Sequence, residues 1–313
     1  MTPHEHTHEC GHNHDHCAHE ANRYEQAFAK FNLSLNDETV QAEVDKLIAD
    51  NVEKYRTPEA IRDLMGTLEI TTLTVEDSDE SVLAMVEKIN KFYDEHPDVP
   101  PVATVCTYPN FANLVRNSLE VEGTITAVVS GAFPSSQSFL EVKTVETALA
   151  VKDGAEEIDM VLSVGKFFSG DYETVCDEIA EIKNAAGESP LKVILETGVL
   201  KTAENIARAS VLSVFSGCDF LKTSTGKVPV SATPFAAYVI CSIIKEYYKQ
   251  TGIKIGFKAA GGVNTLEDAL GYYTIVMELL GKEWIEERLF RIGTSRLANV
   301  MASAVLGEEV KML

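Results

Sequence analysis

From residue 68 to residue 295 the chain repeats one pattern eight times: a short apolar and β-branched run, then a stretch with helical spacing. The runs are LEITTLT (68–74), VATVCTY (102–108), TITAVVS (124–130), EEIDMVLS (156–163), LKVILET (191–197), FLKTST (220–225), IKIGFKA (253–259) and LFRIGTS (289–295). Helix-like stretches separate them, for example 81–96, 171–187 and 265–281. Eight alternating β and α units are what a closed barrel requires, so the sequence predicts an α/β fold with a single (β/α)8 TIM barrel.

A doubly wound open sheet is the alternative fold for alternating strands and helices. That architecture usually has a glycine-rich turn after its first strand, and none follows LEITTLT here. The expected helix ends agree with the assignment, since Ser78 or Asp79 can cap the first barrel helix and Gly187 follows a later one. The barrel is therefore favoured, with its chemistry at the carboxyl ends of the strands.

Two segments precede the barrel, which we place at residues 57–310. Residues 23–56 have apolar side chains at helical spacing, which predicts a helical extension. Residues 1–22 hold seven of the eight histidines and two of the six cysteines, and apart from Met1 they contain no aliphatic residue larger than alanine. Such a segment cannot form a core, so we predict a disordered His-rich tail.

Three lysines lie near the ends of predicted strands: Lys192 in LKVILET, Lys222 in FLKTSTGK and Lys258 in IGFKAAGG. An ammonium group inside an apolar run is costly unless it is paired or loses its proton. A single lysine of this kind usually extends its ammonium group to solvent, but three of them about 30 residues apart favour a shared function. A lysine with a lowered pKa is suited to form a Schiff base with a carbonyl substrate.

Lys222 and Lys258 fall on predicted strands six and seven, which are neighbours in a barrel. Two ammonium groups ~6 Å apart, at an effective dielectric constant of ~20, repel each other by ~3 kcal/mol, which corresponds to ~2 pKa units. One of the two lysines can therefore be a free amine near neutral pH. Asp159 is the acid inside a fourth strand that is otherwise apolar beyond its start. It is expected to pair with a lysine, to transfer protons, or to do both.

Glycines and small polar residues form a second set at the strand ends. Loops after strands seven and eight of a TIM barrel, together with a helix N-terminus, often form a phosphate site from backbone N–H groups. A lone Gly-Gly pair is usually only a turn, but this one is followed one unit later by Gly-Thr-Ser. The candidate substrate-binding residues are Glu69, Cys106, Thr223, Gly226, Lys227, Gly261, Gly262, Gly293, Ser295 and Arg296.

The composition excludes several classes of partner. The net charge of −21, from 27 basic and 48 acidic residues, argues against nucleic acid and against an anionic membrane surface. No apolar run reaches the ~18 residues of a membrane span, and the cysteines lack the spacing of a disulfide framework, so a reducing cytoplasm is predicted. An anionic substrate is still compatible, because the lysines would concentrate positive charge in the site. The oligomeric state stays open, with a homodimer as one alternative.

Six segments carry a resemblance to a known family. TVCTYPNF (104–111), EEIDMVLS (156–163), LKVILETG (191–198), DFLKTSTGKV (219–228), GFKAAGGV (256–263) and RIGTS (291–295) resemble, in order, the signature segments of the deoxyribose-phosphate aldolases, a class I aldolase family. The resemblance extends from about residue 57 to residue 305. It implies the reversible cleavage of 2-deoxy-D-ribose 5-phosphate to acetaldehyde and D-glyceraldehyde 3-phosphate, in deoxyribonucleoside catabolism and without a metal or other cofactor. Another class I aldolase, acting on a different phosphorylated sugar, is the alternative.

The resemblance also implies roles for four residues. By motif, Lys222 matches the family's Schiff-base lysine, Lys258 the second lysine that perturbs its pKa, and Asp159 the catalytic carboxylate. Lys192 matches a lysine near that carboxylate.

The chain departs from the family pattern at three places. Glu69 stands where the family's first strand usually has aspartate, and Arg296 stands where some members have a second serine. The chain ends in EEVKML, without the C-terminal tyrosine that some members use in proton transfer.

The tail offers a separate chemistry. Its histidines, with Cys10 and Cys17, are ligands of the kind that zinc and nickel prefer. We predict adventitious nickel or zinc on residues 4–19 and no catalytic metal, because Schiff-base chemistry needs none. Metal storage or delivery is the alternative function for this segment alone.

Overall fold

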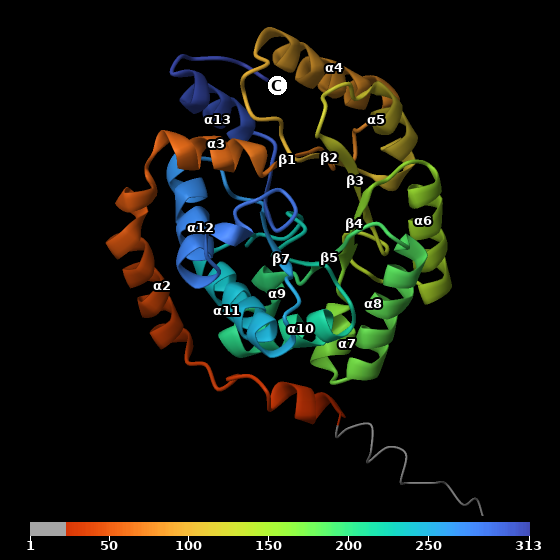
Figure 1. Ribbon diagram of the computed structural model, residues 1–313. Coiled ribbons are helices and arrows are strands. Elements are labelled where there is room, and N and C mark those ends of the chain that lie inside the picture. Colours follow the sequence, from red (N-terminus) through yellow and green to blue (C-terminus); the bar gives the residue numbers. More distant parts are fainter. Residues whose placement is uncertain (1–22) are drawn as a thin grey trace, which may run out of the picture.

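Each of the eight predicted runs forms a strand, and the strands pair in parallel, each with its sequence neighbour, until β8 closes on β1. The computed structural model describes residues 23–313, so the predicted tail lies outside the described residues. The strands are β1 Leu68–Thr71, β2 Thr104–Thr107, β3 Ile125–Ser130, β4 Glu157–Val161, β5 Leu191–Ile194, β6 Phe220–Lys222, β7 Gly256–Ala260 and β8 Phe290–Thr294. The predicted (β/α)8 TIM barrel is confirmed (Figure 1).

Most strands end before the apolar runs do. β6, for example, ends at Lys222, although the run continues to residue 225. The reason is that the next side chains bond to neighbouring loops: the Thr223 hydroxyl accepts a hydrogen bond from the backbone N–H of Ala260, and the Thr225 hydroxyl donates to Glu196. The polar ends of the runs therefore build the rim of the barrel.

Helices surround the strands on the outside (Figure 1). They are α3 Pro58–Gly66, α4 Asp79–Glu95, α5 Ala112–Ser118, α6 Leu140–Lys152, α7 Val164–Phe168, α8 Tyr172–Ala186, α9 Thr197–Leu200, α10 Ala203–Phe215, α11 Pro234–Thr251, α12 Leu266–Leu279 and α13 Leu297–Leu306, with short 3-10 turns η1 Val52–Tyr55, η2 Pro109–Phe111 and η3 Lys282–Trp284. Ser78 caps α4 in a capping box, and Gly187 ends α8, both as predicted. Within residues 23–313, no helix is both long and apolar enough to cross a membrane.

The extension ahead of the barrel is helical in the described residues. A helical turn occupies residues 23–28, and α2 (Asp37–Asn51) follows. α2 packs on the outside of α11 and α12 (Figure 1). The first residue of α2 also contacts a third helix. The Asp37 carboxylate accepts a hydrogen bond, 2.8 Å long, from the backbone N–H of Ala203 at the start of α10. The division of the chain at residues 22 and 56 stays a prediction.

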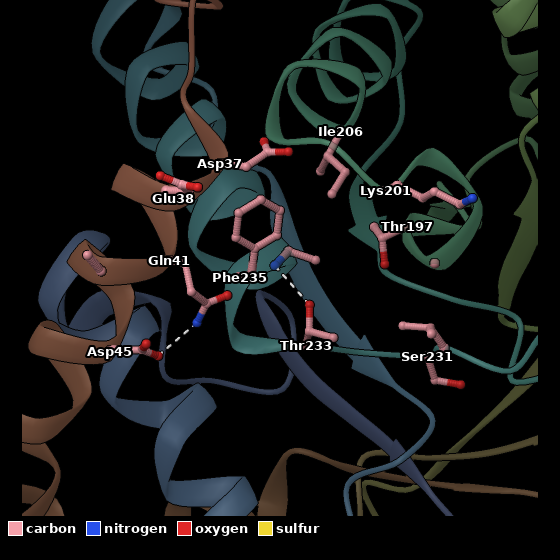
Figure 2. Close-up of a pocket in the computed structure, with 14 residues that line it drawn as sticks. Asp37, Glu38, Gln41, Asp45, Thr197, Lys201, Ile206, Ser231, Thr233 and Phe235 are labelled. Atoms are coloured by element: carbon pink, nitrogen blue, oxygen red, sulfur yellow. Dashed lines mark hydrogen bonds between the residues drawn. The ribbon is translucent and has the colours of Figure 1, made fainter.

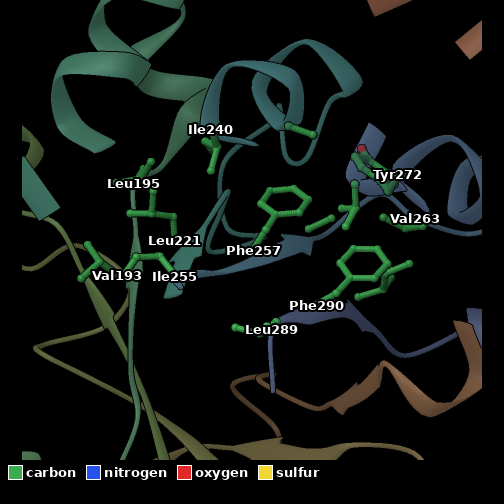
Figure 3. Close-up of a cluster of buried hydrophobic side chains, with 14 of the residues drawn as sticks. Val193, Leu195, Leu221, Ile240, Ile255, Phe257, Val263, Tyr272, Leu289 and Phe290 are labelled. Carbon is green, nitrogen blue, oxygen red and sulfur yellow. The ribbon is translucent and has the colours of Figure 1, made fainter. Parts of the chain in front are cut away.

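The core between strands and helices depends on the alternation of side chains along each strand. Leu221 and Phe257 point outward and pack under Ile240 of α11, whereas their neighbours in sequence point into the barrel (Figure 3). Phe257 and Phe290 stack with ring centroids 6.2 Å apart and an interplanar angle of 9°. This outward layer holds the strands in the register that places the inward side chains together.

We expect Phe257→Ala to lower the free energy of unfolding by about 3–5 kcal/mol, because it leaves a cavity under α11. Phe168→Ala is the matched control, since Phe168 is half exposed and its loss should cost about 1 kcal/mol or less. Urea denaturation measures both values. Equal losses in the two variants would contradict the placement of Phe257 in the core.

Candidate active site

Three lysines and one aspartate meet inside the barrel near the carboxyl ends of the strands. The sheet register pairs Lys222 with Lys258, and Asp159 with Lys192. One oxygen of Asp159, Oδ2, lies 2.7 Å from Lys222 Nζ and 2.5 Å from Lys258 Nζ. The other, Oδ1, lies 3.0 Å from Lys192 Nζ. All four side chains are buried, so the cluster predicted from the sequence is present in space.

Glu69 points into the barrel and joins this cluster, as the alternation along β1 predicts. Leu68 and Ile70 face the helices, and the carboxylate between them accepts a hydrogen bond from Lys258. Its other oxygen lies 3.8 Å from Lys192 Nζ and 3.6 Å from Arg291 Nη1. The carboxylate at this position is therefore paired with the second lysine of the cluster.

A second layer of charge lies below the first, toward the amino ends of the strands. Arg291 on β8 donates two hydrogen bonds of 2.9 Å to the two carboxylate oxygens of Glu157 on β4. Glu157 in turn lies 2.5 Å from Lys192 Nζ. Lys192 thus connects the lower ion pair with Asp159. This bidentate arrangement fixes the position of Lys192 from below.

The cluster contains more cations than anions. Four basic groups (Lys192, Lys222, Lys258 and Arg291) face three carboxylates (Glu69, Glu157 and Asp159) in a buried space. An excess buried charge is unfavourable, and the loss of a proton from one lysine removes it at the lowest cost in free energy. Burial, followed by the charge of Arg291, lowers the pKa of Lys258 well below its usual value.

The pKa values of Asp159 and Lys192 shift in the directions that favour their charged forms. Burial alone would raise the pKa of Asp159, but the charges of Lys192 and Lys222 outweigh burial and hold that pKa below its ordinary value. Burial would likewise lower the pKa of Lys192, but Asp159 and Glu157 raise it. The cluster therefore combines a carboxylate whose pKa is lowered, Asp159, with an amine whose pKa is lowered, Lys258.

Above the cluster a cavity of about 300 Å³ opens at the carboxyl end of the barrel. Lys222 and Lys258 form part of its floor, and the loops after β1, β6, β7 and β8 form its walls. Its lining includes the candidate residues Gly226, Lys227, Gly261, Gly293 and Ser295. The structure thus brings the lysine pair and most of the expected phosphate loops to one cavity, whose volume suits a small metabolite.

Three glycines in these loops have conformations that other residues rarely adopt. Gly226 has a φ angle of +77°, and Gly261 and Gly262 each have a φ angle of +80°. A Cβ atom on Gly261 would also lie 2.7 Å from Ser231 Oγ. Lys227, in the loop after β6, extends its ammonium group to the backbone oxygen of Leu73 after β1.

Five of the candidate substrate-binding residues lie outside the lining of this cavity, and one of them is Glu69, whose contacts are given above. Thr223 is buried, and its hydroxyl is bonded to the backbone of Ala260. Gly262 lies in the loop just beyond Gly261, and Arg296 is exposed at the N-terminus of α13. Cys106 is buried beside the cluster, and burial raises its pKa to about 12. The C-terminal residues are held against α13, because the backbone N–H groups of the last two residues donate hydrogen bonds to the side chain of Asn299.

Glu69, Cys106 and Asp159 bring ligand-type atoms within 4.8 Å of one another, which is close enough to consider a metal. Their chemistry does not fit one. The two carboxylates already contact lysine ammonium groups, and the raised pKa of Cys106 keeps its thiol protonated. A divalent cation would add charge where cations are already in excess.

A larger hollow of about 840 Å³ lies beside the barrel mouth, between α2 and the loops after β5 and β6 (Figure 2). Asp37, Glu38 and Asp45 of α2 line one side, and Thr197 and Ser231 lie on the other. The acidic side chains would repel an anionic substrate. The smaller cavity, with its lysines, is therefore the better candidate for the active site.

Sequence reasoning missed Glu157 and Arg291. Glu157 was set aside as the start of its strand, although it is two residues from Asp159 and so on the same inward face. Arg291 is a charged residue inside an apolar strand run, which is the signal that selected the lysines. The same argument, applied to every strand, identifies both residues.

Comparison with known proteins agrees with this geometry. Residues 72–274 match the model of a protein family that is described as "DeoC/LacD family aldolase". The chain is 39% identical to a Caenorhabditis elegans protein over 86% of this chain and 91% of that one, and 38% identical to the deoxyribose-phosphate aldolase of Homo sapiens over 74% and 76%. The apo crystal structure of a Toxoplasma gondii protein is 26% identical and covers 80% of this chain and 98% of that one, with a TM-score of 0.71. The resemblance noted in the sequence is confirmed, and the chain belongs to the DeoC/LacD family of aldolases.

Proposed function

We propose that this aldolase cleaves 2-deoxy-D-ribose 5-phosphate reversibly to acetaldehyde and D-glyceraldehyde 3-phosphate through a Schiff base on Lys222. The observation that carries the proposal is the pair of lysine amines on one carboxylate oxygen, at the floor of a cavity walled by glycine-rich loops. The similarity to the human deoxyribose-phosphate aldolase supports the choice of substrate. The site needs no metal or other cofactor for this chemistry.

The first step is the attack of the Lys222 amine on the aldehyde carbon C1 of the open-chain sugar. The proton that Lys222 must lose can pass to Lys258, whose pKa is lowered and whose amine contacts the same oxygen of Asp159. Loss of water from the resulting carbinolamine gives an iminium ion. Lys222 suits this role because its ammonium group has one hydrogen bond, to Asp159, whereas Lys258 is held by both Asp159 and Glu69. The less constrained amine is the one that can leave its partner and enter the cavity.

The second step breaks the C2–C3 bond. The C3 hydroxyl loses its proton and becomes the aldehyde of the released triose phosphate, while the bonding electrons move into the iminium to form an enamine. Asp159 lies next to both amines and is held ionised, so it can accept that proton directly or through a water molecule. Lys192 keeps the carboxylate in place through its other oxygen. Protonation of the enamine at C2 and hydrolysis then release acetaldehyde.

The phosphate is assigned to the loops around Gly226, Gly261 and Gly293, with the backbone N–H groups near the start of α13. Lys227 supplies positive charge in the same wall. The substrate then spans the cavity, with its aldehyde at the lysines and its phosphate at the rim. A role in deoxyribonucleoside catabolism and a cytoplasmic location follow from this substrate as proposals.

A different phosphorylated sugar is the alternative substrate for the same Schiff-base machinery. The products separate the two functions, because only a 2-deoxy aldose releases acetaldehyde. Incubation with 2-deoxy-D-ribose 5-phosphate and an assay for acetaldehyde therefore test the choice of substrate. No acetaldehyde from the wild-type enzyme would contradict it.

We expect borohydride reduction in the presence of acetaldehyde to label Lys222, as located by peptide mass spectrometry. Lys222→Arg keeps a positive charge but lacks a nucleophilic amine, so both the label and the cleavage activity should be lost. Lys227→Arg serves as the matched control, and it should keep the label. A label on Lys192 or Lys258 in the wild-type protein would overturn the assignment.

Lys258→Met should move the pH at which the label forms upward by about two units, from the ~3 kcal/mol repulsion between two ammonium groups at this spacing. The reason is that the substitution removes the second amine from the shared Asp159 oxygen, so the two ammonium groups no longer repel each other. Lys258→Arg retains the positive charge, so its labelling should still occur near neutral pH. If neither variant changes the pH dependence of labelling, burial rather than repulsion from this neighbour sets the pH at which the label forms.

Glu69→Gln should reduce cleavage activity about ten- to a hundredfold, as expected for the loss of a charged hydrogen bond of about 1.5–3 kcal/mol. The label on Lys222 should still form, because Glu69 does not contact that amine. Glu69→Asp keeps the carboxylate and should retain more activity than Glu69→Gln. Steady-state kinetics compares the three proteins, and wild-type kinetics in Glu69→Gln would show that this carboxylate is not needed for catalysis.

A further inference from the structure

Glu196, directly after β5, is a buried carboxylate that the proposed reaction does not use. Its side chain is 5% exposed, and it is not part of the lining of the active-site cavity. Unlike the carboxylates of the charge cluster, it forms no ion pair within residues 23–313. Burial of a carboxylate without a cation is unfavourable unless hydrogen bonds compensate for it. The partners of those hydrogen bonds therefore indicate the role of Glu196.

Both carboxylate oxygens of Glu196 bond to one residue, Thr225, in the loop after β6. The backbone N–H of Thr225 donates to Oε1 over 3.2 Å, and its hydroxyl donates to Oε2 over 2.5 Å. The same hydroxyl accepts a hydrogen bond of 3.0 Å from the backbone N–H of Lys227. The carboxylate therefore holds two residues of this loop, one on each side of Gly226.

Gly226 is the residue of this loop that presents a free backbone donor. The N–H groups of Thr225 and Lys227 are both engaged, whereas that of Gly226 has no partner within the described residues. Gly226 lines the active-site cavity. Free backbone N–H groups in such turns bind anions. Because the residues on both sides of Gly226 are held, the Glu196 carboxylate sets the position of this donor.

The backbone of Glu196 is itself in an unusual conformation. Its φ and ψ angles are both +57°, in the left-handed region that side chains other than those of glycine, asparagine and aspartate rarely adopt. Just beyond this turn, a Cβ atom on Gly198 would lie 2.0 Å from the backbone oxygen of Val230. The loops after β5 and β6 are thus in close contact at two places. Strained residues of this kind are found where the surrounding structure holds them, often at functional sites.

We propose that Glu196 is a positioning residue of the phosphate site, which acts through Thr225 to hold the loop around Gly226 in its binding conformation. This inference rests on the proposed function, in which the substrate phosphate binds to that loop. Glu196 acts without touching the substrate, because it lies outside the cavity lining. It affects the binding of the phosphate end of the substrate, and the carbonyl chemistry at Lys222 does not depend on it.

Steady-state kinetics tests the proposal with two substrates. Glu196→Gln should raise the KM for 2-deoxy-D-ribose 5-phosphate about tenfold or more, because an amide has one acceptor oxygen for the two donors of Thr225. The kcat, and the kcat/KM for unphosphorylated 2-deoxy-D-ribose, should not change. A loss of activity on both substrates alike would assign Glu196 a general structural role and overturn the proposal.

Lys201→Gly is the matched control for Glu196→Gln. Lys201 is the other residue beside α9 with a left-handed backbone, at φ +65°, and its exposed side chain does not line the active-site cavity. This variant should have the KM of the wild-type enzyme. A rise in KM equal to that of Glu196→Gln would show that any change beside α9 disturbs the site, and would overturn the specific role of the carboxylate.

A double-mutant cycle tests the path through Thr225. Thr225→Val removes the hydroxyl and should raise the same KM, whereas Thr225→Ser keeps the hydroxyl and should raise it less. The combination of Glu196→Gln with Thr225→Val should raise the KM no further than the larger single effect, because the two residues act as one unit. Multiplication of the two single effects in the double variant would overturn the proposed path.

Calorimetric titration with glycerol 3-phosphate separates this inference from the proposed substrate. This phosphate monoester has no carbonyl group, so it cannot react with Lys222. Glu196→Gln should weaken its binding by the factor by which it raises the KM, and Lys201→Gly should not. Binding of this kind in an enzyme that releases no acetaldehyde would contradict the proposed substrate and support the role of Glu196. No binding to the wild-type protein, or equal binding to Glu196→Gln, would overturn that role.

Discussion

The contact of the buried Asp159 carboxylate with three lysine side chains is the interaction on which the rest of the site depends. In water such an arrangement would be weak, because solvent screens each pair. Inside the barrel every group must be compensated, and four cations face three carboxylates. The imbalance lowers the pKa of Lys258, and a protein at neutral pH thereby obtains an amine that can lose its proton.

The barrel wall is what makes this arrangement possible. Phe220 lies two residues before Lys222 on β6, and Lys192 Nζ lies 5.6 Å from the centre of its ring. A Cβ atom on Gly256 would lie 2.3 Å from an atom of that ring, so a glycine on β7 is needed for the ring to occupy the barrel. The aromatic ring therefore helps to fill the barrel around the charge cluster, while the glycine-rich loops leave it open above. Substrate can reach the lysines from one end.

A buried ion pair holds helix α6 against the barrel. Its buried Lys143–Glu178 pair holds loops near the ends of β3 and β4, since Ser136 and Ser163 bond to the same lysine. A buried ion pair of this kind tolerates few substitutions, because loss of one partner leaves the other uncompensated.

The alternation of strand-like and helix-like runs was sufficient to predict the barrel, because period-two and period-3.6 patterns are local properties of the chain. Strand order then followed from sequence order, so Lys222 and Lys258 could be expected on neighbouring strands. What the sequence could not determine was the partner of each charge. The register of β8 against β1, and of β4 against β5, decides that Arg291 meets Glu157 and that Glu157 meets Lys192. Only the closed barrel brings these residues within hydrogen-bonding distance, although Glu157 and Arg291 are more than 130 positions apart in the sequence. Closure also buries them, and the charges of Lys192 and Arg291 outweigh burial and hold the pKa of Glu157 below its ordinary value.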